Sequence, residues 1–215
     1  MSPYFVELGP QSLWYLLEGA GRTLWLGIWA IALGTILGIL LGCIRTYSRV
    51  GAILLAPLID ITRSVPLIIQ IVLINSALGI SGFFWGPFVV GVLVLGVYTA
   101  SYTSEVVRSG LQAVPDVTKR AGRALGLTGL QNFVFIIAPI AGRIAFPGWI
   151  NVVLGSLKDT SLVAVIGYVE LLRASQIVIT QTQEALIVLA VAGGIYFVMC
   201  FAISAVAKRV ETMQR

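Results

Sequence analysis

Three long runs without a charged residue constrain this chain more than any other feature of its sequence. They are Thr23–Ile44, Ser64–Ser104 and Ala185–Ala207, and the first of them covers 22 residues. A helix of that length is about 33 Å long, which is enough to cross the hydrocarbon core of a bilayer. Hydrophobic residues make up 58% of the chain and charged residues only 11%. A soluble domain could not bury that much apolar surface, so the composition excludes a soluble enzyme, a disordered chain and a nucleic-acid-binding domain.

The turn signals within these runs divide them into spans. Ser64–Ser104 is too long for one helix, and the segments Gly79–Gly82 and Gly86–Pro87 predict a turn in its middle. By contrast, Ala124–Gly142 is uncharged but begins with glycine and polar residues and is interrupted by Pro139. We expect an interfacial helix and a re-entering segment there rather than a span. The result is an all-α integral membrane protein with five spans, at about 23–44, 58–80, 86–107, 145–169 and 185–207. A six-span alternative would place both chain termini on one side of the membrane.

Basic residues are distributed unequally between the two sides of this five-span topology, and basic loops favour the cytoplasm. One side receives only Arg22 and Arg173. We therefore expect residues 1–22 to form an extracytoplasmic interfacial segment, 23–207 the transmembrane domain and 208–215 a cytoplasmic tail. The topology accounts for the net charge of +5, so the charge requires no nucleic-acid partner. The cytoplasmic side receives Arg45, Arg49, Arg63, Arg108, Lys119, Arg120, Arg123, Arg143, Lys208, Arg209 and Arg215.

Small residues recur every four positions along the first span, at Ala30, Gly34, Gly38 and Gly42. Such a stripe lets another helix approach closely. We favour packing within the chain over a dimer seam. The chain has no histidine, which excludes catalytic and metal sites that depend on imidazole, and we expect no bound metal.

Charged and hydroxyl side chains interrupt the fourth span at Lys158, Asp159, Thr160 and Ser161. A charge at the centre of a bilayer costs roughly 2.5–3.5 kcal/mol on insertion scales, so such residues face protein or water. A zwitterionic amino acid would offer a carboxylate to Lys158 and an ammonium group to Asp159. The alternative is a structural pair that ties this span to a neighbour, for instance through Arg63 or Glu105.

The start of the second span also carries polar features. Pro66 cannot donate a backbone hydrogen bond, and such breaks occur within membranes where the backbone finds other partners or lines a cavity. Ser64 and Gln70 flank this break, and either a helix start or part of a substrate pathway would explain them. For Arg63 we favour a side chain that reaches towards the cytoplasmic face. On the third span, Tyr98, Tyr102 and Glu105 share one helical face.

The cytoplasmic segment 114–139 is basic and rich in glycine. Lys119, Arg120 and Arg123 share one helical face, while Gly122, Gly126 and Gly129 weaken the helix. A short helix of this kind does not stand alone in water, so it docks against a partner or lies on anionic headgroups.

The spacing of this segment resembles the permeases of binding-protein-dependent ABC importers. Their cytoplasmic loop reads EAA, three residues, Gly, nine residues and Ile-x-Leu-Pro, and this chain has Arg120-Ala121-Gly122, then Gly126, then Ile136–Pro139. The motifs at 62–70, 104–115 and 155–176 are similar to polar amino-acid permeases of the histidine, glutamine and arginine type. The chain departs from the pattern at Arg120, Gly122 and Ala138, where Glu, Ala and Leu are usual.

The resemblance implies a type I importer permease fold in a bacterial cytoplasmic membrane, and the proline and polar residues of the second and fourth spans then line the substrate path. A coupling loop at about 116–132 would dock on a cytoplasmic ABC ATPase dimer through Lys119, Arg120, Ala121, Gly122, Arg123 and Gly126. ATP and Mg²⁺ would bind that ATPase, because this chain has no P-loop and no cofactor of its own. Further expected partners are a solute-binding protein outside the membrane, the amino-acid substrate and a second permease, in a heterodimer by preference because of Arg120.

Two other classes of function stay open on the residues alone. A secondary transporter or channel would follow an ion gradient instead of ATP. A membrane-embedded enzyme would need a site without histidine, and Ser161 with Lys158 has the spacing of a Ser-Lys dyad. Nothing that resembles an oxyanion hole accompanies this pair, so we do not expect an enzyme.

Overall fold

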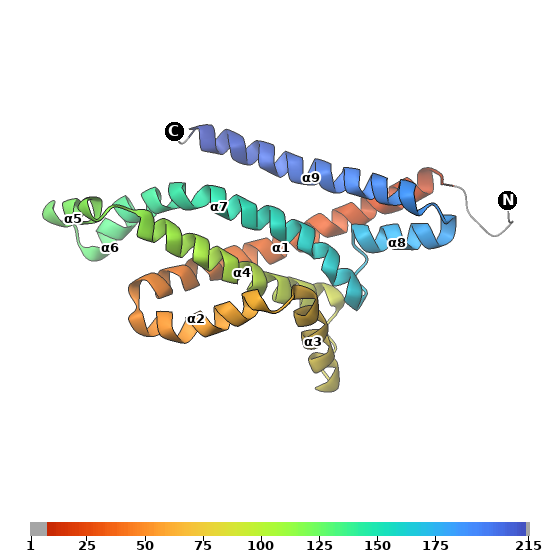
Figure 1. Ribbon diagram of the computed structural model, residues 1–215, viewed down its shortest axis with the longest axis horizontal. Coiled ribbons are helices and arrows are strands. Elements are labelled where there is room, and N and C mark those ends of the chain that lie inside the picture. Colours follow the sequence, from red (N-terminus) through yellow and green to blue (C-terminus); the bar gives the residue numbers. More distant parts are fainter. Residues whose placement is uncertain (1–7, 214–215) are drawn as a thin grey trace.

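The computed structural model describes residues 8–213, and over this range the chain is a bundle of helices joined by short turns (Figure 1). The long helices are α1 (Pro10–Tyr47), α4 (Pro87–Ala113), α7 (Ala138–Asp159) and α9 (Ala185–Met213). The shorter ones are α2 (Arg49–Ser64), α3 (Leu67–Ile80), α5 (Asp116–Ala124), α6 (Gly129–Asn132) and α8 (Leu171–Thr182). A π-helical segment η1 (Phe133–Ile137) precedes α7, and a 3-10 segment η2 (Thr160–Ile166) follows it.

The expectation of five spans is confirmed. Four helical stretches are long and apolar enough to cross a membrane, namely Pro10–Tyr47, Pro87–Ala113, Gly129–Ile166 and Ala185–Thr212. The pair α2 and α3 forms the fifth as a broken span, bent by 104°. The first span is longer than expected, because α1 already begins at Pro10 within the segment assigned to the interface. Residues 1–7 of that segment, and 214–215 of the expected tail, lie outside the described range.

The expected re-entering segment is instead helical and continuous with the fourth span. Residues 133–142 run from η1 into α7 without a turn. Pro139 lies in the first turn of α7, where a missing backbone N–H is least costly. The wider π turn supplies the adjustment, since the N–H of Ala138 donates to the carbonyl of Phe133, five residues earlier. The glycine and polar residues before it form only the short helix α6.

The small-residue stripe packs within the chain, as favoured from the sequence. A Cβ added to Gly34 would lie 2.5 Å from the Cβ of Thr99, and one added to Gly42 would lie 2.8 Å from the carbonyl of Ser104. Gly38 faces Thr103 in the same way. The stripe therefore sets the close approach of α1 and α4. The broken span and α7 pack on this pair, whereas α9 packs mainly on α7 and α8.

The two ends of the bundle differ in what they carry. In Figure 1, α5 and α6 lie at one end and α8 at the other, and α7 crosses the length between them. α3 projects from the side of the bundle and packs on α4 and η2. A buried cluster joins these elements, and its members are Leu26, Ala30, Leu67, Ile71, Val90, Val94, Leu95 and Val163.

Candidate functional site

The charged residues of the fourth span lie where α7 ends and the chain tightens into η2. Lys158 is exposed and Asp159 is half-buried. Neither forms an ion pair with another charged side chain in the described part of the chain, so the alternative of a structural link to Arg63 or Glu105 is not present. The hydroxyl of Thr160 donates to the carbonyl of Leu157 at 2.6 Å, and that of Ser161 donates to Lys158 at 2.8 Å. Both hydroxyl protons are thus used locally, while their oxygens can still accept a hydrogen bond.

A line of polar side chains runs along α4 from this point. Tyr98 lies within electrostatic reach of Asp159, and its ring packs on Tyr102 with centroids 5.0 Å apart and the two hydroxyls 3.3 Å apart. The guanidinium group of Arg63 lies over the ring of Tyr102, 5.0 Å from its centroid. We call Asp159, Tyr98, Tyr102 and Arg63 the polar line. Tyr98, Tyr102 and Arg63 contact one another directly, whereas Asp159 is near enough to Tyr98 to act on it through its charge.

The side chain of Gln70 stabilises the break in the helix at Pro66 through hydrogen bonds. The amide Nε2 of Gln70 donates to the carbonyls of Thr62 and Val65, each at 2.8 Å. These carbonyls lie where α2 ends and the proline cannot supply a donor. Gln70 therefore stabilises the bend, and its half-buried amide oxygen keeps its acceptor capacity. Ser64 is the last residue of α2 and is exposed.

The fold brings the two predicted segments of the substrate pathway to the same side of the bundle. α3 packs directly against η2, with Leu67 and Ile71 in one buried cluster with Val163. The bend at Pro66 and the polar end of α7 are thus neighbours, although about 90 residues separate them in the sequence.

Glu105 continues the face of Tyr98 and Tyr102 towards the basic end. Its carboxylate accepts hydrogen bonds from Arg45, across the α1–α4 contact, and from Arg108 at 2.9 Å. Arg63 approaches the same carboxylate at 3.9 Å. One acid therefore binds three arginines, and Arg63 packs on protein as well as reaching towards the aqueous face.

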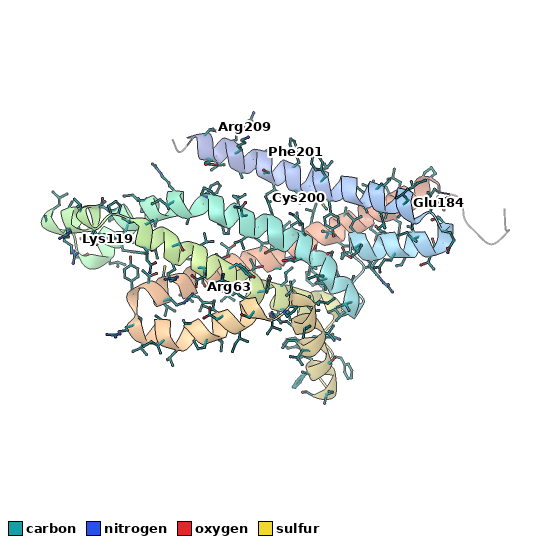
Figure 2. All side chains as sticks on the ribbon, in the orientation of Figure 1. Arg63, Lys119, Glu184, Cys200, Phe201 and Arg209 are labelled. Atoms are coloured by element: carbon teal, nitrogen blue, oxygen red, sulfur yellow. The ribbon has the colours of Figure 1, made fainter. Side chains whose placement is uncertain are left out.

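The predicted coupling residues form a separate surface at the end of the bundle that carries α5, where Figure 2 labels Lys119. α5 is held by Asn132, which is buried and whose Nδ2 donates to the carbonyl of Lys119 at 2.9 Å. Gly122 is buried directly against this asparagine. Gly126 ends the turn after α5 with φ of 81°, a conformation that favours glycine.

The outward face of α5 carries both charge and apolar surface. Arg120, Ala121 and Arg123 are exposed, as are Val117 and Leu125 at 73% and 80%. Lys119 is paired with Asp116 at 3.2 Å. The structure thus separates the predicted set, because Gly122 faces the protein while Arg120, Ala121 and Arg123 face outward.

Sequence reasoning missed Asn132, the Arg45–Glu105 pair and the buried Glu170. Asn132 carried no signal beyond being a polar residue in an apolar run, and its partner lies 13 residues away. Arg45 and Glu105 are 60 residues apart. A charged residue at the margin of an apolar run indicates a partner, but only the fold identifies which one.

Comparison with known proteins identifies the family of the chain. Residues 34–214 match the family described as "Binding-protein-dependent transport system inner membrane component". The chain belongs to this family. It is 30% identical over 199 residues to the glutamine transport system permease protein GlnP of Escherichia coli (strain K12), with 91% of each chain covered. It is also 31% identical to the nopaline transport system permease protein NocM of Agrobacterium fabrum, covering 93% of this chain and 87% of NocM.

Solved structures share the fold over almost the whole chain. A chain of an amino acid ABC transporter crystallised with histidines matches with a TM-score of 0.86 and 26% identity, covering 97% of this chain and all of that one. A chain of the MetNI methionine ABC transporter in an inward-facing conformation matches with a TM-score of 0.83 and 18% identity, covering 96% and 99%. The family member described here therefore has the five-span fold of type I ABC importer permeases.

Proposed function

We propose that this chain is the transmembrane permease subunit of an ATP-driven importer of polar amino acids that works by alternating access. The observation that carries the proposal is the polar line, because it places Asp159, Tyr98, Tyr102 and Arg63 along one path through an otherwise apolar bundle. Charged residues inside a membrane domain are typical of substrate pathways. The permeases of amino-acid transport systems to which the chain is similar support the same substrate class.

In this proposal Asp159 binds the ammonium group of the substrate and Lys158 its carboxylate. Ser161 and Gln70 offer acceptor oxygens, and Pro66 with Ser64 forms the bend beside them. Thr160 is fully buried, so it supports η2 and does not contact the substrate. Lys158 and Asp159 are adjacent on α7 and point about 100° apart, and no ion pair holds them to another described side chain. Groups left without such partners remain available to a zwitterion.

In this proposal ATP-driven movement reaches the permease at the end of the bundle that carries α5. α5 docks on a separate cytoplasmic ABC ATPase dimer through its exposed face, in which Val117, Arg120 and Ala121 combine apolar contact with positive charge. ATP and Mg²⁺ bind the ATPase and this chain binds no cofactor. Gly122 and Asn132 fix α5 to the start of α7, so movement of α5 is passed to the helix that carries Asp159.

The complete transporter needs further partners. A second permease completes the pathway, and we favour a heterodimer, because Arg120 replaces the acid that is usual in this loop. A solute-binding protein delivers the substrate from outside. The chain lies in a bacterial cytoplasmic membrane with its N-terminus outside. Lys119 and Arg209 lie towards one end of the bundle and Glu184 at the other (Figure 2), which supports this orientation.

Reconstitution tests the proposal directly. The permease is purified with its ATPase and inserted into liposomes, and uptake of radiolabelled glutamine, histidine and arginine is measured with the binding protein present. We expect uptake that requires ATP and persists when ionophores dissipate ion gradients. Uptake that follows an ion gradient and ignores ATP would establish the alternative, a secondary transporter or channel.

Asp159→Asn tests the substrate pathway. We expect the maximal uptake rate to fall at least about tenfold, because one ionic contact of roughly 1.4 kcal/mol is lost where the ammonium group binds. The complex should still assemble, since Asp159 ties no helix to another through an ion pair. Glu18→Gln, which removes an exposed ion pair with Arg22, serves as the control. Unchanged uptake by Asp159→Asn would assign Lys158 and Asp159 a structural role.

A further inference from the structure

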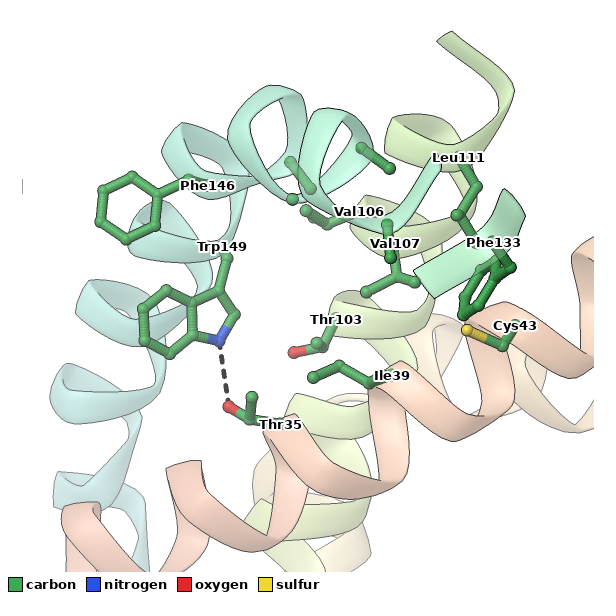
Figure 3. A pocket seen from close by; sticks show the side chains of 14 residues that line it. Thr35, Ile39, Cys43, Thr103, Val106, Val107, Leu111, Phe133, Phe146 and Trp149 are labelled. Atoms are coloured by element: carbon green, nitrogen blue, oxygen red, sulfur yellow. Dashed lines mark hydrogen bonds between the residues drawn. The ribbon is translucent and has the colours of Figure 1, made fainter. Parts of the chain in front are cut away.

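A cavity of about 330 Å³ lies between α1, α4 and α7, and none of its lining residues belongs to the polar line or to α5 (Figure 3). Its size is within the range of ligand pockets in proteins. The wall is almost entirely apolar, and the indole Nε1 of Trp149 is already bonded to Thr35 at 3.0 Å. The lining consists of Thr35, Ile39, Cys43, Thr103, Val106, Val107, Leu111, Phe133, Ala138, Ala141, Gly142, Ala145, Phe146 and Trp149. Such a wall suits a hydrocarbon chain and not a polar amino acid.

One lining group has an unused hydrogen bond. Thr103 is fully buried, and its Oγ1 has no partner in the described chain. In α1 and α2, by contrast, Thr23, Thr46 and Thr62 each donate to the carbonyl four residues earlier. The Cβ and methyl group of Thr103 lie against Gly38, and Figure 3 shows its hydroxyl directed into the cavity. A buried hydroxyl without a partner is costly, so this one points to a ligand with an acceptor oxygen.

The depth of the cavity indicates which acceptor would be present. Arg108 marks the charged level on α4, and Thr103 lies five residues deeper, which is about 7.5 Å along the helix. This distance is comparable to the headgroup layer that separates water from hydrocarbon, where the ester groups of phospholipids lie. From Thr103 the cavity extends to Thr35 and Trp149 in one direction, as an acyl chain would, and to Leu111 and Phe133 in the other.

α7 carries an exposed cation next in sequence to the residues that line the cavity. Arg143 directly follows Gly142 of the lining and is exposed, without a hydrogen bond or an ion pair to the described residues. Its neighbours Ala141 and Ala145 both contact Gly110, so Arg143 lies at the level of the charged end of α4. Basic residues at this level between spanning helices are typical of sites for anionic lipid headgroups.

We propose that the cavity binds one phospholipid from the leaflet at the basic end of the bundle. One acyl chain fills the space between α1, α4 and α7, an ester carbonyl accepts the hydrogen bond of Thr103, and the phosphate binds Arg143. The lipid is a bound component of the permease that holds α7 to α1 and α4. This site is separate from the substrate path and from the ATPase surface, because it shares no residue with either.

Native mass spectrometry of the delipidated permease–ATPase complex, titrated with phosphatidylglycerol, tests the site. We expect one tightly retained lipid per permease. Gly142→Leu should abolish its retention, because the space beside Gly142 is open and the new side chain occupies the cavity. Gly193→Leu is the matched control: it also meets open space, but on α9 and outside the cavity. Equal lipid retention in both variants would overturn the proposal. Loss of the permease pair in Gly142→Leu would also overturn it, because it would show that the second permease fills the cavity.

Two smaller changes test the polar contacts even if Gly142→Leu fails to fold. Thr103→Val should weaken phosphatidylglycerol binding about fivefold, as expected for one hydrogen bond. Arg143→Gln should weaken it by a similar factor, about fivefold, through loss of one cation at the surface. If no lipid uses the hydroxyl, Thr103→Val will instead leave both phosphatidylglycerol binding and the lipid-induced shift in melting temperature at their wild-type size. That result would refute the hydrogen bond and with it the site.

Discussion

Single glycines on α1 set the distance between this helix and α4. Gly38 lies directly against the Cβ of Thr103, whereas a Cβ added to Gly21 of the same helix would meet nothing within 4 Å. A side chain at position 38 would force the helices apart, and overpacking of this kind typically costs about 1–3 kcal/mol. A side chain at position 21 only restricts the unfolded backbone.

We therefore expect opposite results from Gly38→Ala and Gly21→Ala. The first should lower the free energy of unfolding by about 1–3 kcal/mol, and the second should leave it unchanged or raise it by up to about 1 kcal/mol. Thermal unfolding of the purified complex, followed by tryptophan fluorescence, measures both. Equal melting temperatures for the two variants would contradict the close approach.

Glu170 is a buried acid at the end opposite to α5. It caps α8, because its Oε1 accepts from the N–H of Arg173 at 2.7 Å and its Oε2 from the N–H of Leu172 at 2.8 Å. Tyr196 of α9 donates to the same Oε2 at 2.9 Å. Burial raises the pKa of this carboxyl above its ordinary value, and these hydrogen bonds oppose the shift only in part.

This shift predicts how stability depends on pH. A carboxyl whose pKa is higher in the folded state binds more protons there, so its contribution to stability is lost as the pH rises from the ordinary carboxyl pKa of about 4.3 to the raised value. The melting temperature of the wild type relative to Glu170→Gln should therefore fall across this interval and be constant above it. If the melting temperature of the wild type relative to Glu170→Gln rose with pH across this interval, the raised pKa of Glu170 would be contradicted. Glu18→Gln, at an exposed position, should show no such trend.

The α1 stripe and the cap show what can be predicted at the scale of residues. The spacing of Gly34, Gly38 and Gly42 is a local pattern, so intrachain packing could be predicted from the sequence. The bond between Glu170 and Tyr196 could not, because Tyr196 is 26 residues away on another helix. Favourable contacts between distant residues leave no periodic signal.

At the scale of elements, α5 is held in place by a contact that explains a departure from the family pattern. The second alanine of the usual loop is Gly122 here, and a Cβ at this position would overlap the buried Oδ1 of Asn132. The same asparagine binds the carbonyl of Lys119. Glycine at 122 and asparagine at 132 therefore form a matched pair.

Gly122→Ala should displace α5 and lower ATP-driven uptake at least about fivefold, since α5 would lose a hydrogen bond worth about 1 kcal/mol as well as its packing. Asn132→Ala removes the side chain that a Cβ at position 122 would overlap, but it also removes the hydrogen bond to the carbonyl of Lys119. On its own it should therefore lower uptake. In the double variant the overlap is gone, and we expect less loss than the sum of the two single effects. Uptake and ATP hydrolysis in proteoliposomes measure all three. Strict additivity would show that the two residues are not coupled.

The elements also show why one expectation was wrong. Gly129 and Pro139 disfavour a helix and Gln131 is too polar for a span, and together they predicted a re-entering segment at 133–142. The π turn at η1 absorbs the irregularity, so the chain continues as one helix into the membrane. Local propensities indicate a disturbance, but whether a helix ends or adapts depends on the packing of its neighbours.

At the scale of the whole molecule, one helix connects the two proposed functional regions. α7 begins beside α5 and α6 and ends at Asp159, and its 22 residues are about 33 Å long. α7 stays helical throughout although Pro147 lies within it, so we expect a displacement of α5 at one end to reach the polar line at the other. The broken second span lies beside this far end, where a bend can open or close against η2.

Much of this architecture could be predicted from the sequence. The thickness of the hydrocarbon core sets the length of each span, and the apolar runs of the sequence have this length. The division of Ser64–Ser104 at Gly79–Gly86 agrees with the end of α3 and the start of α4. The 104° bend at Pro66 could not be predicted in magnitude, because it depends on Gln70, α4 and η2 together.

The orientation of the chain gives the last prediction. With five spans we expect the two termini on opposite sides of the membrane, and from the excess of arginine and lysine around α5 and the end of α9 we expect that end in the cytoplasm. Alkaline phosphatase, which is active only outside the cytoplasm, should therefore be active when fused before Pro10 and inactive when fused after the C-terminus. A fusion in the α5–α6 turn should be inactive, and one between α8 and α9 should be active. Activity at both termini or at neither would require an even number of spans, and α2 with α3 would then enter and leave by the same face.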